Sequence, residues 1–417
     1  MLRLFLLAEK GQEPMAERTL LVVGHGMVAQ RLLERLVASA DHPYTSIDVL
    51  SAEAVPAYNR VLLSSVLAGD ASLDAITLQP LDWFRAHRIR LHPDTRVTRL
   101  DANAKQVTAE DGRTFGYDDL VIATGARPSS LSLPGESLEG VVTFRDIRDT
   151  EQLLAMSAHY RRAVVIGGGF LGLEAAEGLS QQGMAVTVIH RSPHLLNRQL
   201  DPTAGELLGE ALEARGIHCI TGESPRSLVG QRRVRAVELS NETLVSTDLV
   251  VLAAGITPNA ELARDAGLDC DRGIHIDHQL QTSADNVYAL GECCQLGEHT
   301  FGLVEPGYQQ AEILAGVLCG DAERFEPSDV ATRLKISGIP IFSCGQARPG
   351  PDTESVIWQD HESARYCHLL LRDNRLAGAV LFGETQDGPW YFDQLQQQRD
   401  LSAYRQQLAF GAAYCDA

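Results

Sequence analysis

The segment AVVIGGGFLG, residues 163–172, is the most informative part of the chain. It joins a short apolar run, typical of a buried parallel strand, to three glycines and the start of a helix pattern. The segment TLLVVGHGMVA, residues 19–29, repeats this order, and a second apolar run follows each copy, at 185–189 and 46–50. Both copies therefore predict a strand–turn–helix–strand unit of the kind that binds a dinucleotide.

The small residues of each motif have different tasks. The first allows a tight turn, the second lets the backbone approach a pyrophosphate, and the third lets helix and strand pack closely. The pyrophosphate lies on the helix N-terminus, where unpaired N–H groups favour an anion. These positions hold Gly24, Gly26 and Ala29 in the first copy and Gly167, Gly169 and Gly172 in the second. Two motifs in the right context favour two bound dinucleotides over unrelated glycine turns.

Further apolar runs complete the fold prediction. Two of them, at 120–125 and 249–255, end in glycine and would each return a strand end to its own nucleotide. The character of the chain changes after residue 327. Strands are expected there over 336–343, 367–371 and 378–382, and a final helix over 394–410. The expected class is α/β, with two Rossmann-like domains and a small C-terminal α+β domain.

Three shorter patterns carry a resemblance to a family. Thr124-Gly125 follows the first unit, Gly255 lies in an Ala-x-Gly-x-x-Pro-Asn pattern after the second, and Gly291-Glu292 ends a Tyr-Ala-x-Gly-Glu pattern. Together with the two motifs, they make the chain resemble the FAD-dependent pyridine-nucleotide oxidoreductases. The resemblance implies an FAD domain into which an NAD(P)H domain is inserted. The implied limits are a tail 1–17, an FAD domain 18–140 and 263–326, an NAD(P)H domain 141–262, and a C-terminal interface domain 327–417.

A closer resemblance is to the flavin part of NAD(P)H-dependent nitrite reductases. It rests on the segments Pro56–Ser65, Asn197–Asp201, Gly291–Cys293 and Thr332–Gly338. Those enzymes also have a Cys-rich iron–sulfur module and a sirohaem domain, of which this sequence has no sign. We therefore expect an electron-transfer subunit similar to that of assimilatory nitrate reductase, with the nitrate or nitrite reductase catalytic subunit as its acceptor. The alternatives are a ferredoxin or rubredoxin reductase, and a redox-inert FAD/NAD sensor or scaffold.

The resemblance and the motif spacing imply roles for residues around FAD. Glu53, near the end of the second strand, would hold the adenosine ribose, unless it is only a surface carboxylate. Arg60 would lie near the pyrophosphate or the flavin, unless it is a surface charge. Thr124 and Gly125 would border FAD. Glu292 would accept hydrogen bonds from the ribityl hydroxyls, with a helix cap as the alternative.

Other residues are implied around NAD(P)H, together with Gly255. Glu174 matches a glutamate that faces the nicotinamide, although an acid near a helix start is also stabilised by the dipole. The second strand ends in His190-Arg191, where NAD-specific enzymes place a carboxylate. Arg191 could pair with a 2′-phosphate or be solvated. NADH and NADPH therefore both stay open as donors.

The expected chemistry needs no protein nucleophile and no metal. Bound flavin carries the redox step, so no catalytic residue is assigned. The chain has eight cysteines, none before Cys219, and no C-x-x-C pattern. This excludes the N-terminal dithiol of disulfide reductases and disfavours zinc ribbons and iron–sulfur clusters.

Charge and hydropathy limit the classes of partner that we expect for this chain. Lys and Arg total 36 against 55 Asp and Glu, so the net charge is −19, which disfavours nucleic acid and anionic membranes. No apolar run reaches the roughly 18 residues that suggest a membrane span. The apolar start is cut short at residues 9–14, so we expect a loose tail, no secretory signal, and a cytoplasmic protein. A homodimer is left open.

The segment 327–417 is the expected docking platform for the acceptor, because the nucleotide motifs are accounted for upstream of it. The aromatic side chains that could anchor a partner, or else form a core, are Trp358, Trp390, Tyr391 and Phe392.

Overall fold

The computed structural model describes residues 18–39, 41–336 and 338–415, which fold as two compact units. Unit 1 comprises the described residues up to Tyr58, Thr77–Ala126 and Pro258–Glu326. Unit 2 comprises Asn59–Ile76, Arg127–Thr257 and the described residues from Pro327 onward. The chain thus leaves unit 1 and returns to it, as an inserted domain requires. The expected tail 1–17 lies outside the described residues, and the domain limits given above stay predictions.

Unit 1 contains a five-stranded parallel sheet in the order β19-β7-β1-β2-β3. Its strands are β1 (Thr19–Val23), β2 (Ser46–Leu50), β3 (Ile89–His92), β7 (Asp119–Ile122) and β19 (Val287–Ala289). In register, Val23 lies between Leu50 and Ile122, so the apolar runs stand side by side. A parallel strand in the middle of such a sheet is buried on both faces, so its sequence is a continuous run of apolar residues.

Unit 2 repeats this architecture in the order β12-β11-β10-β16-β9, again parallel throughout. Its strands are β9 (Val141–Thr143), β10 (Arg162–Ile166), β11 (Ala185–His190), β12 (Ile217–Thr221) and β16 (Leu249–Leu252). Each unit also has a three-stranded antiparallel sheet, which follows β3 in unit 1 and β12 in unit 2 along the chain. These are β4 (Val97–Asp101), β5 (Gln106–Ala109) and β6 (Thr114–Gly116), and β13 (Pro225–Gly230), β14 (Val234–Leu239) and β15 (Leu244–Ser246). The repeat seen in the two motifs therefore extends over both nucleotide folds, and the α/β class is confirmed.

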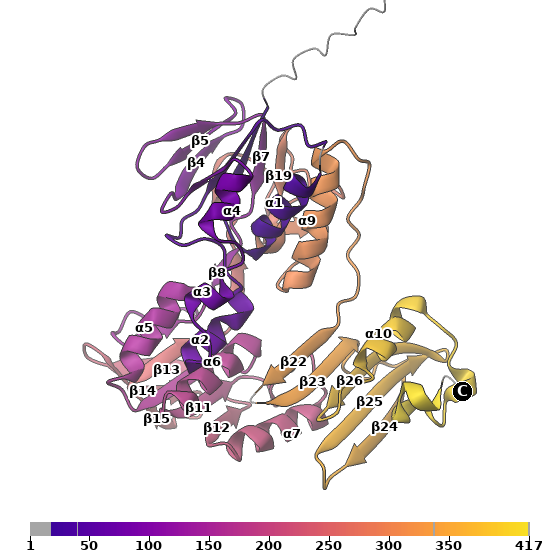
Figure 1. The fold of residues 1–417 in the computed structure, drawn as a ribbon. Helices are drawn as coiled ribbons and strands as arrows, with labels where there is room; N and C mark the ends of the chain where they lie inside the picture. The colour runs from indigo at the N-terminus through magenta and orange to yellow at the C-terminus, as the bar shows by residue number, and fades with distance from the viewer. Residues whose placement is uncertain (1–17, 40, 337, 416–417) are drawn as a thin grey trace, which may run out of the picture. The chain divides into compact units, whose positions relative to one another are not determined.

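Helices and short strands complete both units. In unit 1, α1 packs against α9 (Figure 1); the helices are α1 (Met27–Ala38), α4 (Leu81–Ala86), α8 (Glu261–Asp265), η2 (Gly291–Cys293) and α9 (Val304–Leu318). In unit 2, α2 packs against α6; the helices are η1 (Arg60–Leu62), α2 (Leu63–Ala68), α3 (Leu73–Ile76), α5 (Ile147–Ser157), α6 (Phe170–Gln181) and α7 (Pro202–Glu213). The short strands are β8 (Ala126–Pro128), which pairs with β17 (Ile256–Pro258), and β18 (Ile274–His275), β20 (Cys294–Leu296) and β21 (His299–Thr300), which form a sheet.

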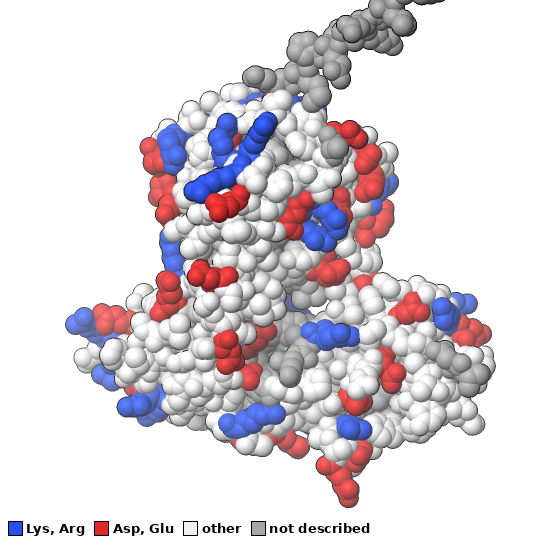
Figure 2. Space-filling model, viewed as in Figure 1, with Lys and Arg blue, Asp and Glu red and all other residues white. Residues whose placement is uncertain are grey.

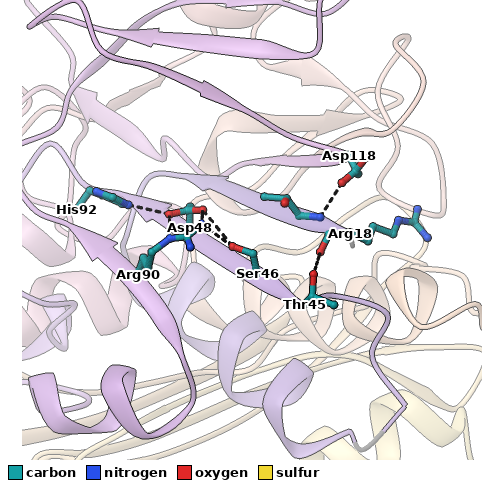
Figure 3. A network of polar contacts seen from close by, with 8 residues as sticks. Arg18, Thr45, Ser46, Asp48, Arg90, His92 and Asp118 are labelled. Atoms are coloured by element: carbon teal, nitrogen blue, oxygen red, sulfur yellow. Dashed lines mark hydrogen bonds and ion pairs between the residues drawn. The ribbon is translucent and has the colours of Figure 1, made fainter. Parts of the chain in front are cut away.

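A buried carboxylate fixes the edge of the unit 1 sheet. Asp48 on β2 accepts from Arg90 Nε at 2.7 Å, and its Oδ1 lies 2.8 Å from His92 Nε2, both on β3 (Figure 3). Burial alone would raise the pKa of Asp48, but the hydrogen bonds from Arg90 and His92 outweigh it and lower the pKa below 3.8. The charged cluster therefore anchors β3 on β2.

The C-terminal segment forms an antiparallel sheet in the order β22-β23-β26-β25-β24. The elements are β22 (Thr332–Ile336), β23 (Ile339–Gly345), β24 (Glu354–Asp360), β25 (Arg365–Arg372), β26 (Arg375–Phe382), α10 (Gly388–Gln397), η3 (Ser402–Tyr404), η4 (Leu408–Phe410) and η5 (Ala412–Tyr414). The strand expected over 336–343 corresponds to β23, but it starts later, at Ile339, because Ile336 is the last residue of β22.

The expected final helix over 394–410 is wrong. The helix α10 starts earlier, with Pro389 in its first turn, and ends at Gln397 because Gln398 adopts a left-handed conformation with φ 50°. Tyr391 on this helix is only 1% exposed, and its hydroxyl donates to the Leu408 carbonyl at 2.6 Å. It belongs to the core and cannot anchor a partner. The exposed apolar side chains of this segment are instead Ile357, Tyr404, Phe410 and Tyr414.

Two further features of the described structure are the lengths of the helices and the distribution of charged side chains on the surface. In the described part of the chain, no helix has both the length and the apolar character needed to cross a bilayer; α9, for example, has 15 residues. Acidic and basic side chains are interspersed over the face seen in Figure 2.

One buried carboxylate joins the C-terminal sheet to the nucleotide fold of unit 2. Asp201 caps α7 by accepting from the Ala204 N–H at 2.9 Å. Its other oxygen lies 2.5 Å from His368 Nδ1 and accepts from the Tyr366 hydroxyl at 2.9 Å. Burial would raise the pKa of Asp201, but the hydrogen bonds from His368, Ala204 and Tyr366 outweigh it and lower the pKa below 3.8.

We expect Asp201→Ala to lower the free energy of unfolding by about 3 kcal/mol, since it leaves buried donors unpaired. The lowered pKa means that the carboxylate contributes fully above pH 3.8, and that its contribution is lost as pH falls through the native pKa. Urea unfolding at neutral pH and below pH 3.8 measures both effects. The exposed Asp352→Ala is the matched control, and an equal loss in the two variants would contradict the role of Asp201.

Candidate nucleotide-binding sites

The first glycine of the unit 1 turn is held by contacts of its backbone. The Gly24 N–H donates to the Leu50 carbonyl at 2.9 Å, and Gly24 has φ +103°. A Cβ on Gly24 would lie 2.2 Å from the Ala123 carbonyl oxygen, so no side chain fits. Ala29, the third small position, is 1% exposed and packs in the core between helix and sheet. These two positions are therefore small because of the fold itself.

Gly26 has a different reason to be glycine. It precedes α1 with φ −99° and ψ −169°, a conformation that any residue adopts. No heavy atom of the described chain lies within 4 Å of where its Cβ would be, and no described side chain caps the helix. Neither strain nor packing requires glycine here. The open space and the uncapped N–H groups fit a bound pyrophosphate that approaches the backbone.

Other residues expected around the first nucleotide converge on this turn. A Cβ on Gly125 would lie 3.7 Å from Glu292 Oε2, and one on Gly291 would lie 3.7 Å from Val28 at the start of α1. The Thr124 hydroxyl donates to the Asn259 carbonyl at 2.8 Å, and the Asn259 amide returns a hydrogen bond to the Thr124 carbonyl at 2.9 Å. Two strand ends are thereby locked beside the turn.

Sequence reasoning missed Gln310 on α9. Its Oε1 accepts from the Gly291 N–H at 2.7 Å and the side chain is fully buried, which fixes the left-handed Gly291 at φ +81°. Within the described residues, Gln310 Nε2 is buried without a protein acceptor. A buried polar residue 19 positions from its partner gives no local pattern, so only the fold could reveal it.

Glu53 and Arg60 are placed less directly. Glu53 follows β2 and is half-buried; its carboxylate accepts from the Tyr58 hydroxyl at 2.8 Å. Arg60 starts η1 in unit 2 and donates to the Arg145 carbonyl of that unit at 3.2 Å. The nucleotide contacts of both residues stay predictions.

The second turn, in unit 2, repeats the geometry of the first. The Gly167 N–H donates to the Ile189 carbonyl at 2.9 Å, φ is +129°, and a Cβ would lie 2.3 Å from the Ala253 oxygen. At Gly172 a Cβ would lie 1.9 Å from the Gly167 oxygen. Gly169 precedes α6, and again no heavy atom of the described residues lies within 4 Å of its Cβ position. The same reasoning therefore makes room for a second dinucleotide.

The end of β11 makes a contact that the sequence did not predict. His190 acts on the turn itself: its Nδ1 lies 3.1 Å from the Gly168 nitrogen, and its Nε2 lies 3.1 Å from Asn197 Oδ1. Arg191 follows the strand and its side chain is exposed, so it can reach either a bound phosphate or solvent. Gly255, with φ +128°, follows β16, and its carbonyl accepts from the Ser129 N–H at 3.0 Å.

Glu174, in the second turn of α6, is the strongly perturbed acid of this site. Burial first, and the nearby Glu177 carboxylate second, raise the pKa of Glu174 from 4.5 to about 7. Acids with a pKa close to the working pH are typical of functional sites.

The cysteines do not form a redox pair. All eight lie in the described part of the chain as free thiols. Cys293 and Cys294 are adjacent and fully buried, and burial raises the pKa of both thiols. Among the described residues, no cluster of His, Cys, Asp or Glu is arranged to hold a metal.

Comparison with known proteins agrees with the resemblance stated from the sequence. Residues 18–311 match the family model "pyridine nucleotide-disulphide oxidoreductase", and residues 331–399 match the "rubredoxin NAD+ reductase C-terminal domain". The chain is 40% identical over 389 residues to nitrite reductase [NAD(P)H] of Bacillus subtilis (strain 168), covering 93% of this chain and 48% of that protein. It is 39% identical over 395 residues to the assimilatory nitrate reductase electron transfer subunit of the same organism, covering 94% of this chain and 51% of the relative.

Solved structures show the same architecture. The putidaredoxin reductase–putidaredoxin complex matches with a TM-score of 0.83 at 25% identity, over 92% of this chain and 94% of that chain. NADH:rubredoxin oxidoreductase from Clostridium acetobutylicum matches with a TM-score of 0.77 at 23% identity, over 93% and 97% of the two chains. The present chain spans about half the length of the two Bacillus relatives.

We expect Gly26→Ala and Gly169→Ala to fold normally yet bind their nucleotides weakly, since each new methyl group enters space that only the ligand would use. Gly172→Ala is the matched control, because its methyl group would collide with the Gly167 carbonyl at 1.9 Å and destabilise the fold. Thermal unfolding and nucleotide affinity separate the two kinds of effect. Normal nucleotide binding by both Gly26→Ala and Gly169→Ala would contradict these sites.

We expect Glu174→Gln to stabilise the protein at pH values above about 7, by about 1–2 kcal/mol after solvent screening. Because the native pKa is raised, the wild type binds the proton more tightly when folded, so it loses stability as pH rises from 4.5 to about 7. Unfolding of both proteins across this range is the measurement, with the exposed Glu151→Gln on α5 as the control. A constant difference at all pH values would show that Glu174 does not titrate as described.

Proposed function

Because the chain belongs to the pyridine nucleotide-disulphide oxidoreductase family, we propose that it passes electrons from NAD(P)H through FAD to a partner redox protein of nitrate or nitrite assimilation. As a member of this family the chain is an oxidoreductase, and its cofactors are FAD and NAD(P)H, as the two glycine motifs predict. The direction of transfer and the acceptor are the proposed part.

One observation of the structure carries this proposal. Gly26 and Gly169 both start a helix beside empty space, and neither is glycine for reasons of strain or packing. A single turn of this kind would fit one nucleotide. Two fit a protein that brings a reduced nicotinamide and a flavin into one chain.

The proposed tasks of this chain's residues are binding and orientation. When bound, FAD would supply the redox chemistry that links two-electron donation by NAD(P)H to the acceptor. The turn residues hold the two pyrophosphates, Glu53 holds the adenosine ribose of FAD, and Glu292 accepts from the ribityl chain. Arg60 and Thr124 border FAD, and Glu174 faces the nicotinamide. No cysteine takes part, since none precedes Cys219.

The acceptor is proposed from the relatives. Both Bacillus relatives are about twice this length; one is named nitrite reductase [NAD(P)H], and the other is named an electron transfer subunit of assimilatory nitrate reductase. We propose a catalytic protein of this kind as the partner, in the cytoplasm, with a homodimer as the form to test. The C-terminal sheet is the proposed docking platform, with exposed Phe410 and Tyr414 in place of the buried Tyr391.

A second candidate acceptor has a specific observation behind it. Residues 331–399 match the C-terminal domain of rubredoxin NAD+ reductases, so rubredoxin or ferredoxin is the alternative partner. Because the chain is 40% and 39% identical to the nitrogen-assimilation relatives, we rank rubredoxin or ferredoxin second as the acceptor.

The test uses the full chain loaded with FAD and kept free of oxygen. NADPH or NADH should bleach the visible absorbance of the flavin, and the reduced protein should then reduce the catalytic subunit of nitrate or nitrite reductase. Arg191→Ala should weaken NADPH by the ~1.5–3 kcal/mol of a charged hydrogen bond and change NADH little. Equal effects on both donors would show that Arg191 does not read the 2′-phosphate.

Two outcomes would overturn the proposal. A flavin that neither donor bleaches would point to a redox-inert sensor. Rapid transfer to rubredoxin or ferredoxin, with none to the nitrogen-assimilation partners, would select the alternative acceptor.

Replacing all eight cysteines should leave dye reduction by NAD(P)H intact in a folded, FAD-loaded variant.

A further inference from the structure

A histidine side chain links the glycine turn of unit 2 to the loop that follows β11. His190 ends β11, and its Nδ1 lies 3.1 Å from the backbone nitrogen of Gly168. Because that nitrogen can only donate, Nδ1 must accept and carry no proton. The ring proton is therefore on Nε2, which lies 3.1 Å from Asn197 Oδ1 and donates to it. Both partners select the same neutral form of the ring.

Gly168 is held on both of its backbone polar groups. Its N–H donates to His190, and its carbonyl accepts from the Leu196 N–H at 2.9 Å. A Cβ on Gly168 would lie 2.6 Å from Leu195 Cδ2 and 2.8 Å from His190 Cγ. The loop thus fills the space that a side chain on Gly168 would need, and it fixes the middle of the turn.

The loop is itself held by the C-terminal segment of unit 2. Arg348, after β23, donates to the Asn197 carbonyl at 2.7 Å, and its Nη2 lies 3.4 Å from His194 Nε2. The His194 Nδ1 lies 3.0 Å from the Leu195 carbonyl and so donates to it. A continuous set of hydrogen bonds therefore runs from Arg348 through Asn197 and His190 to Gly168.

We propose that His190 is a positioning residue for NAD(P)H, whose neutral ring holds the Gly167–Gly169 turn in the shape that receives the pyrophosphate. The inference rests on the proposed function, because it takes this turn as the NAD(P)H site. A proton on Nδ1 would turn the acceptor into a second donor facing the Gly168 N–H. The hydrogen bond would break, and the turn would bind the nucleotide less tightly.

The surroundings keep the ring neutral at ordinary pH. Burial first, and then the nearby His194 and Arg191, lower the pKa of His190 below 6.5, against the opposing hydrogen bond to Asn197. Glu223 approaches through its N–H, 3.3 Å from the His190 carbonyl, while its carboxylate accepts from Ser240 and Asn241. The turn should therefore be intact above pH 6.5 and loosen as pH falls through the native pKa.

The test measures NADP+ affinity of the FAD-loaded full chain by calorimetry, above and below pH 6.5. In His190→Asn, the amide oxygen can take the place of Nδ1 and accept from Gly168 without titrating, whereas His190→Leu removes the acceptor. His159→Asn, at an exposed site in the same unit, is the matched control. Titration of the 2′-phosphate of the ligand is common to all four proteins.

Lowering the pH should weaken NADP+ binding by the wild type and by His159→Asn roughly 5- to 10-fold more than it weakens binding by His190→Asn. This factor is the effect of about one hydrogen bond. His190→Leu should be weakened by a similar factor at both pH values. Two-dimensional ¹H–¹⁵N NMR of the histidine rings should show His190 protonated on Nε2 and bare on Nδ1 at neutral pH, a readout that does not depend on turnover.

The outcomes separate this inference from the proposed function. If the wild type binds NADP+ and His190→Leu binds equally well, only the positioning role is wrong. If His190→Leu does not fold, a pH dependence that persists unchanged in His190→Asn overturns the role. If the wild type binds neither NADP+ nor NAD+, the proposed function fails, and this inference fails with it.

Discussion

Both nucleotide folds depend on one close approach of backbone to backbone. In each, the first glycine of the motif lies against the carbonyl at the end of a neighbouring parallel strand, Ala123 in unit 1 and Ala253 in unit 2. The gap would leave a Cβ only 2.2 Å or 2.3 Å from that oxygen. The first residue of the turn can therefore carry no side chain, and the left-handed φ at both glycines agrees with this. The helix that follows starts over the strand ends only because the turn is this tight.

The two copies share this constraint but stabilise the middle of the turn differently. In unit 1 the middle residue is His25, a buried ring whose Nε2 lies 3.1 Å from Gln30 Oε1 on the following helix, and whose pKa burial lowers to about 4. In unit 2 the middle residue is Gly168, and the imidazole comes from His190, 22 residues later. The first turn is braced by its own helix. The second is braced by a loop that also contacts the C-terminal segment through Arg348.

Buried charge is used sparingly and with partners. Asp48 and Asp201 are both buried, and hydrogen bonds hold the pKa of each below its usual value. Asp48 fixes a sheet edge, and Asp201 fixes the C-terminal sheet on α7. Glu174 differs from both, because burial and a neighbouring carboxylate raise its pKa to about 7. Burying a carboxyl group that lacks hydrogen-bond donors destabilises the fold, and such groups are typical of functional sites. For this reason we connect Glu174 with the nicotinamide.

The sequence alone determined the two parallel nucleotide folds and the glycines that line them. Strand periodicity and glycine spacing act over about ten residues, so β1 and β2 were predicted with the limits that the structure has. The tertiary structure decided what these patterns could not contain. It paired His190 with Gly168, Gln310 with Gly291, and Asp201 with His368, the last across 167 positions. It also ended α10 at Gln397 and buried Tyr391. Such contacts depend on which surfaces meet after the chain has folded, and no local pattern records that choice.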